Sequence, residues 1–126
     1  RSYLGDAERA IEDLQQALRL SPLDSTLWIA QTGMANAHFL RGRYEEALSW
    51  VSMALRQRPN SLSALRVAIA AHALAGDVDR ARQLVGRYRE LDPDARLAKM
   101  REWWWFRGGE DVEKYLEGFR LAGMPE

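Results

Sequence analysis

The chain has 126 residues, enough for one ordinary domain, and its 47% hydrophobic content favours a folded protein over a disordered one. Its 18 Lys and Arg residues are balanced by 18 Asp and Glu residues, so no net field attracts nucleic acid or an anionic membrane. Because cysteine is absent, disulfides, thiol catalysis and cysteine-ligated metals are excluded. No apolar run approaches the ~20 residues of a membrane span.

Glycine, alanine, proline and histidine recur at a fixed spacing along the chain. Residues 41–60 and 75–94 align with a constant offset of 34, and residues 4–23 fit the same template 37 positions earlier. The aligned residues are Gly42 with Gly76, Ala47 with Ala81, Pro59 with Pro93 and His38 with His72, preceded by Gly5, Ala10 and Pro22. A fixed period of this length is typical of a helical repeat protein.

Each copy predicts two helices, with a glycine in the turn between them and a proline that ends the second. This pattern resembles the tetratricopeptide repeat, which implies an all-α fold, an α-α superhelix of antiparallel helix pairs with a C-terminal capping helix. We expect a half repeat over 1–24, repeats over 25–60 and 61–94, and capping helices over 95–126. The large positions of the first helices depart from the family pattern, with Gln31, Met34, Ala35 and His38 in one repeat and Leu65, Ala68, Ile69 and His72 in the next.

The junction before the second repeat has two interpretations. Ser21 as N-cap, with Pro22 at the first helical position and Asp24 three residues after Ser21, predicts a helix that begins about one turn early. In the alternative, Asp24 or Ser25 caps the helix and residues 21–24 form a longer loop.

Two stretches differ in how their apolar residues are distributed. Residues 61–75 are apolar nearly all round, with Arg66 as the one charge, which predicts a helix covered on several sides. Residues 110–122 place their apolar residues at helical spacing on one face, as a terminal cap requires. These residues are Val112, Tyr115, Leu116 and Phe119.

Residues 97–126 resemble the ending of bacterial class III adenylate/guanylate cyclase-like proteins that carry such repeats, and of related repeat proteins with a winged-helix DNA-binding domain. Those chains commonly close with a Tyr-Leu-x-Gly-Leu-x-x-Ala-Gly-Leu-Pro-like segment, and YLEGFRLAGMP (115–125) fits, with Phe119 and Met124 replacing leucines. The resemblance implies the C-terminal repeat region of a cytoplasmic cyclase-like signalling protein. A winged-helix regulator is the alternative. The half-repeat start leads us to expect a fragment of a longer chain.

Catalytic motifs are scarce, since the sequence has neither a phosphate-binding glycine loop nor a Gly-x-Gly-x-x-Gly pattern. We therefore predict no enzyme activity, no cofactor and no metal. His38 and His72 lie one repeat apart, but neighbouring helices are about 8–10 Å apart and two imidazoles on one metal need closer nitrogens. We expect both to pack inward, each with a hydrogen-bond partner.

Repeats of this family commonly bind an extended peptide or a helix along the face formed by the first helix of each pair. By position that face would be lined by Thr32, Asn36, Phe39, Ser63, Arg66 and Ala70. Two alternatives remain: a protein or peptide partner binds there, or the chain's own tail fills the groove.

The run Trp103-Trp104-Trp105-Phe106 points nearly all round a helix, so one core face cannot accept all four side chains. On a helix starting near Asp94, Trp104 continues an inward stripe. In the resembling family this stretch commonly reads apolar-Pro-Phe-Arg, which implies structural roles for Trp104 and Phe106 and a helix broken by residue 105.

Trp103 and Trp105 are then the surplus aromatics and the candidate exposed interface. Trp105 has burial under the 110–122 helix as its alternative. Self-association through these tryptophans is a further prediction, which would make the chain a homo-oligomer.

Overall fold

The computed structural model describes residues 8–13, 15–16, 27–106 and 112–126, with the backbone alone described for 103–106. All regular secondary structure in these ranges is α-helical. Both interpretations of the 21–25 junction fall outside the described residues, as does Gly5 of the first copy. The helical residues 8–13 and 15–16 precede α2, and Ile11 packs against Met34 and Ala37 of that helix.

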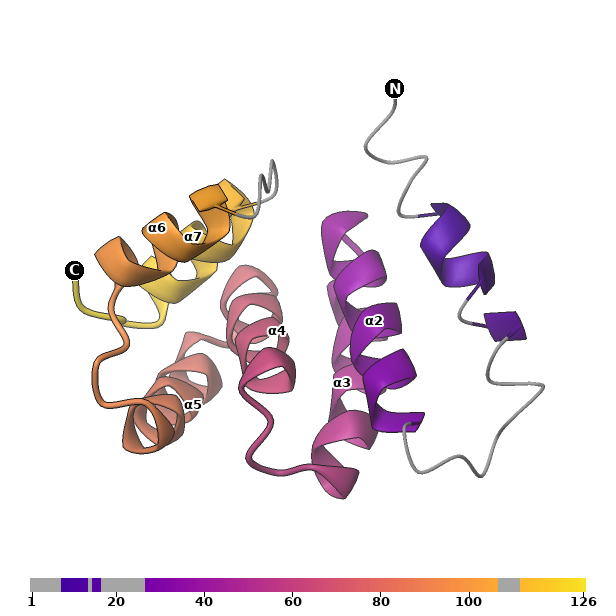
Figure 1. Ribbon diagram of the computed structural model, residues 1–126, viewed down its shortest axis with the longest axis horizontal. Coiled ribbons are helices and arrows are strands. Elements are labelled where there is room, and N and C mark those ends of the chain that lie inside the picture. The colour runs from indigo at the N-terminus through magenta and orange to yellow at the C-terminus, as the bar shows by residue number, and fades with distance from the viewer. Residues whose placement is uncertain (1–7, 14, 17–26, 107–111) are drawn as a thin grey trace.

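Four helices form the two predicted pairs, α2 (Leu27–Leu40) with α3 (Tyr44–Gln57) and α4 (Leu62–Leu74) with α5 (Val78–Leu91). The pairs follow one another across the molecule in chain order, and α6 and α7 close the end opposite the N-terminal helical residues (Figure 1). The predicted succession of helix pairs is therefore confirmed.

Glycine makes the tight turn inside each pair. Gly42 and Gly76 have φ of 80° and 100°, a conformation that other residues rarely adopt. The residue after each glycine donates its N–H back to a carbonyl in the last turn of the preceding helix, from Arg43 to His38 at 2.9 Å and from Asp77 to His72 at 2.8 Å. This backbone hydrogen bond, which closes a loop of six residues, is characteristic of a Schellman motif. The recurring glycine therefore forms the turn that its spacing predicted.

Helix α4 lies at the centre of the core, as its apolar sequence predicted. It packs against α2, α3, α5 and α7. Its exposed fraction is 4% or less at the eight buried positions, which are Ala64, Leu65, Val67, Ala68, Ile69, Ala70, Ala71 and Ala73. The small alanine side chains allow neighbouring helices to approach α4 closely.

Two expectations for α6 (Leu97–Phe106) are wrong. The helix begins at Leu97 rather than near Asp94, because a turn in which the Ala95 N–H donates to Asp92 O precedes it. It also continues past residue 105. Where the resembling family has proline, this chain has Trp105, whose backbone N–H is retained, so the reason for a break is missing.

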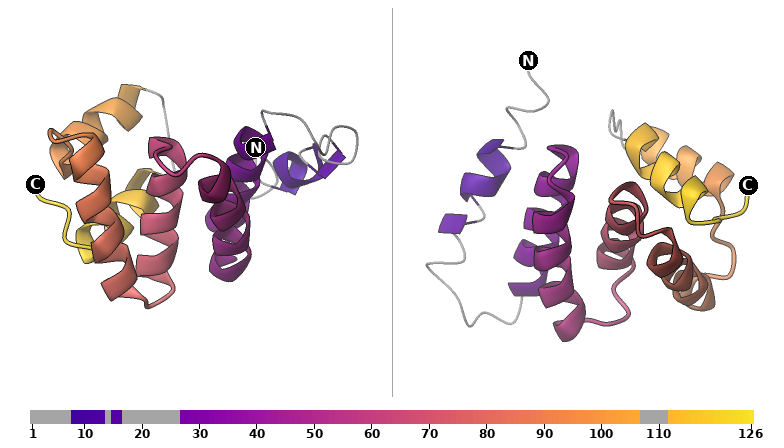
Figure 2. Two further views of the ribbon diagram at one scale, coloured as in Figure 1. Left: turned by 90° about the horizontal axis from the view of Figure 1, so that it is seen from below. Right: turned by 180° about the vertical axis from the view of Figure 1, so that it is seen from behind.

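Helix α7 (Val112–Leu121) buries the face that the sequence predicted, with Tyr115, Leu116 and Phe119 at most 4% exposed. The tail after it turns at Gly123 and returns to the start of α6. There Pro125 O accepts from the Leu97 N–H at 2.7 Å and Glu126 O accepts from the Ala98 N–H at 3.1 Å. The tail thus supplies partners for two amides that a helix N-terminus leaves unsatisfied. Helices α6 and α7 contact each other and lie at the same end of the molecule (Figure 2).

Among the described helices, none combines the length and the apolar character that crossing a bilayer requires.

Candidate functional site

The six groove residues lie on α2 and α4, and α7 divides the surface that they form. Three of them, Asn36, Phe39 and Ala70, contact α7, and we call this part the covered half. The other three, Thr32, Ser63 and Arg66, make contacts with Trp28, Ser61 and Tyr88 respectively, and we call this part the open half.

In the covered half, α7 makes both polar and apolar contacts with the groove. The Tyr115 hydroxyl donates to Asn36 Oδ1, and the Tyr115 ring lies 4.5 Å from that of Phe39, centroid to centroid. Gly118 lies against Ala70, so close that a Cβ at 118 would come within 2.7 Å of the Ala70 Cα. Helix α7, near the C-terminus of the chain, therefore occupies this half. Filling of the groove by the chain itself is one of the two alternatives that the sequence left open.

Lys114 also ties α7 to α2, a role that the sequence did not reveal. Its Nζ donates to Phe39 O at 2.7 Å and lies 5.1 Å from the ring centroids of both Phe39 and Tyr44. A cation is favoured at the C-terminal carbonyls of a helix and over aromatic faces. Lys114 is not one of the apolar residues that define the buried face of its helix. No local signal indicates that it reaches back 75 residues.

The open half presents side chains that local contacts hold in place. The Thr32 hydroxyl donates to Trp28 O at 2.8 Å, and Ser63 is exposed with its Oγ 3.2 Å from Ser61 Oγ. Arg66 Nη1 donates to the Tyr88 hydroxyl at 3.0 Å, which links α4 to α5. The structure leaves partner binding at these residues as a prediction.

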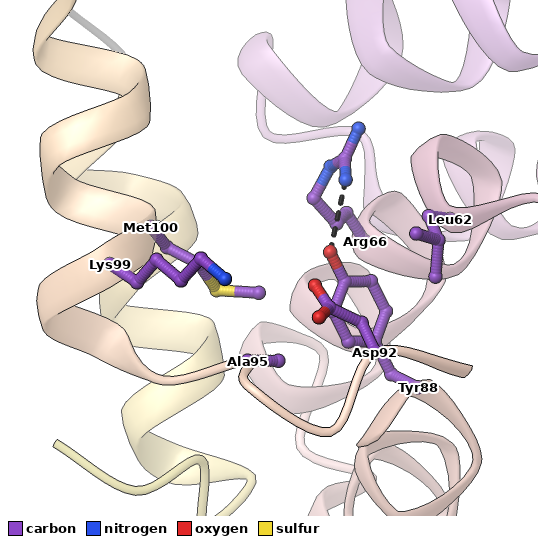
Figure 3. Close-up of a pocket in the computed structure, with 7 residues that line it drawn as sticks. All are labelled: Leu62, Arg66, Tyr88, Asp92, Ala95, Lys99 and Met100. Carbon is purple, nitrogen blue, oxygen red and sulfur yellow. Dashed lines mark hydrogen bonds between the residues drawn. The ribbon is translucent and has the colours of Figure 1, made fainter. Parts of the chain in front are cut away.

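Arg66 also lines a cavity of about 160 Å³ where α4, α5 and α6 meet (Figure 3). Sequence reasoning found Arg66 but none of the other lining residues, because they come from three separate helices and the turn between them. Those residues are Leu62, Tyr88, Asp92, Ala95, Lys99 and Met100.

The two histidines pack inward as predicted, His38 at 8% exposure and His72 half-buried. Burial is the main cause that lowers the pKa of both imidazoles, and nearby carboxylates partly oppose it. His38 Nδ1 lies 4.0 Å from Glu46 and His72 Nδ1 lies 3.8 Å from Asp77, both beyond hydrogen-bond distance. The expected partner for His38 Nδ1 is thus missing within the described part of the chain.

No group of three or more His, Asp or Glu side chains suited to a metal ion occurs in the ranges that the structure describes. The side chains of Trp103, Trp104, Trp105 and Phe106 lie outside the described residues. The assignments of Trp103 and Trp105 as an exposed interface therefore stay predictions.

These helix pairs, their glycine turns and the closing helices form an all-α superhelix of the tetratricopeptide repeat type. Residues 1–61 match the protein-family model described as tetratricopeptide repeat. Over 91 residues, 71% of the chain, the sequence is 32% identical to the protein named "Protein CTR9 homolog" from Arabidopsis thaliana. The chain spans about 8% of the length of that relative.

Proposed function

We propose that this chain is a protein–protein interaction module and that it binds a protein or peptide on the open half of the α2–α4 face. The repeat match and the superhelical fold support the general role. The observation that favours the open half as the binding surface is that α7 occupies the covered half of the groove. Within this proposal the chain is not itself an enzyme, binds no cofactor or nucleic acid, and acts by placing a partner.

Displacement of α7 is an unfavourable way to free the covered half. Leu116 and Phe119 of α7 are fully buried, and burying one such side chain contributes about 1.5–3 kcal/mol. A partner that removed α7 would have to replace these contacts as well as those of Tyr115 and Gly118. A partner that uses Thr32, Ser63 and Arg66 leaves them intact.

The proposal is tested with peptides selected from a random phage-displayed library against the purified chain. The variant Ser63→Glu adds a charge in the open half, at the first turn of α4, where a carboxylate is compatible with the helix. The matched control is Ser52→Glu on the exposed face of α3. We expect at least about 10-fold weaker binding for Ser63→Glu, equivalent to about 1.4 kcal/mol, and unchanged binding for Ser52→Glu. Equal affinities for both variants would contradict the proposed surface.

The parent protein is a finer part of the proposal. The resemblance of YLEGFRLAGMP (115–125) supports a cytoplasmic cyclase-like signalling protein, with a winged-helix regulator as the alternative. The sequence encoded upstream of Arg1 distinguishes them: a mixed α/β catalytic domain supports the first and a basic winged helix the second.

Self-association is the second candidate function, and the adjacent tryptophans in the sequence favour it. Light scattering of the chain, compared with the Trp103→Ala/Trp105→Ala variant, tests it. A wild-type chain that remains monomeric at high concentration would contradict this function and leave the open-half proposal standing.

A further inference from the structure

The cavity between α4, α5 and α6 follows from how the closing helices pack. Helix α6 packs chiefly against α7, while α7 packs against α4. Near the start of α4 and the end of α5, α6 therefore contributes Lys99 and Met100 together with Ala95 of the preceding turn (Figure 3). These side chains do not fill the space beside Tyr88.

The size of this cavity limits what it can bind. Its volume of about 160 Å³ is close to that of a ~150 Å³ protein cavity that accommodates one benzene molecule. Pockets for cofactors and drug-sized ligands are larger, about 300–1,000 Å³. A single leucine, methionine or phenylalanine side chain matches this volume, whereas a nucleotide or a flavin does not.

The charges around the cavity favour a neutral occupant. Leu62, Ala95 and Met100 supply an apolar wall, against which a buried charge would lose hydration. The guanidinium of Arg66 and the ammonium of Lys99 oppose a cationic side chain, and the Asp92 carboxylate opposes an anionic one.

Asp92 brings an acceptor to the same space. Figure 3 shows its carboxylate beside the Tyr88 ring, directed toward the space in front of Met100. Within the described ranges, no residue donates a hydrogen bond to this carboxylate or forms an ion pair with it, so it can accept a main-chain N–H from a ligand. Carboxylates are strong acceptors for such donors.

We propose that this cavity holds one neutral apolar side chain of the partner, of the leucine, methionine or phenylalanine class, while the Asp92 carboxylate accepts the main-chain N–H of the same residue. This inference rests on the proposed function and names the anchor residue that the partner inserts beside Arg66. A buried apolar anchor surrounded by polar contacts is the usual arrangement of a binding hot spot.

The experiment uses the intact chain with ¹³C-methyl-labelled methionine and the neutral probe N-acetyl-leucine-amide. We expect a saturable shift of the Met100 methyl signal, with a dissociation constant on the order of 1 mM for so small a ligand. Met34, which is fully buried against Ile11 and Ala37, is the internal control and should not shift.

Two comparisons separate the anchor from the hydrogen bond. N-acetyl-alanine-amide should bind at least about 10-fold more weakly because it leaves most of the cavity empty. N-acetyl-N-methyl-leucine-amide lacks the main-chain N–H of the leucine and should bind about 5-fold more weakly. The variant Asp92→Ala, which removes the acceptor, should weaken the leucine probe by about the same factor, and Asp79→Ala, a matched change at an exposed carboxylate outside the cavity, should not.

Three results would overturn the inference. One is the absence of a Met100 shift with the leucine probe, which leaves the open-half proposal intact if the selected peptides still respond to Ser63→Glu. Another is equal binding of the alanine and leucine probes. The third is a Met100 shift that depends on protein concentration alone, which would identify a second copy of the chain as the occupant.

Discussion

Gly118 of α7 lies directly against Ala70 of α4, where a Cβ on residue 118 would meet the Ala70 Cα at 2.7 Å and its Cβ at 2.9 Å. Two small residues thus let the two helices approach closely. The same packing places Tyr115, one helical turn earlier, beside Asn36 of α2. One glycine therefore controls how the closing helix sits on both first helices of the repeats.

The variant Gly118→Ala should destabilise the fold by about 1–3 kcal/mol, because the added methyl group meets backbone that cannot move aside. The free energy of unfolding in urea measures the effect. The matched control is Gly86→Ala in α5, where a Cβ has nothing within 4 Å. There the same change should stabilise the helix by about 0.5–1 kcal/mol. If both variants were stabilised, the close approach of α7 to α4 would be wrong.

The Tyr115 hydroxyl and Asn36 should show a direct coupling energy, because they share a hydrogen bond between α7 and α2. A double-mutant cycle with Tyr115→Phe and Asn36→Ala should give about 0.5–1.5 kcal/mol of coupling in the free energy of unfolding. Additive effects of the two changes would mean that the bond contributes nothing measurable. The pair Tyr44→Phe and Asn36→Ala provides the control and should be additive.

Acid should destabilise the protein through its two histidines. Burial lowers the pKa of both imidazoles below that of the unfolded chain, so the unfolded state binds more protons as the pH falls through the ordinary pKa of 6.5. The stability present above that pH is therefore lost progressively toward the lower folded-state pKa values.

Unfolding in urea at about pH 7.5 and pH 5.5 measures this loss, and the His38→Gln/His72→Gln variant should show a smaller difference between the two conditions. An equal difference in both proteins would place the pH dependence elsewhere. The charged groups whose Coulombic effects act on these imidazoles are Glu8, Arg43 and Glu46 for His38, and Asp77 and Arg80 for His72.

Removal of residues 125 and 126 should loosen the first turn of α6. The amides of Leu97 and Ala98 lose their acceptors, Pro125 O and Glu126 O, and their hydrogen exchange should become about 5-fold faster. The Met100 amide donates to Arg96 O at 3.0 Å within the same segment, so its exchange is the internal control. Unchanged exchange at Leu97 would show that the tail does not cap this helix in solution.

The repeat spacing predicted the features of the fold that depend on local sequence. Gly42 and Gly76 mark the turns, and the apolar sequence of 61–75 predicted a central helix, because these signals come from neighbouring residues along the chain. The prediction of where α6 starts was less accurate, because the first amides of α6 donate hydrogen bonds to the carbonyls of Pro125 and Glu126 rather than to a local cap.

The binding role of the candidate site stays a prediction. The positions of the six groove residues were predicted from repeat register alone. The structure shows that α7 occupies the groove at three of them, the covered half. Lys114 was missed because its contacts depend on how distant helices pack, and Asp92 was missed because the cavity that it lines depends on the same packing. Neither residue breaks the amphipathic pattern of its own segment, so no pattern within one helix could have identified them.

The bonds from α7 back to α2 have a consequence for the order of assembly. Lys114 is 75 residues from Phe39, and Tyr115 is 79 residues from Asn36, whereas each helix pair joins segments that are nearly adjacent in the chain. Closing a long loop costs more conformational entropy than closing a short one. We therefore expect the paired helices to form first and the C-terminal segment to dock last, so that the groove is transiently exposed along its full length in every newly made chain.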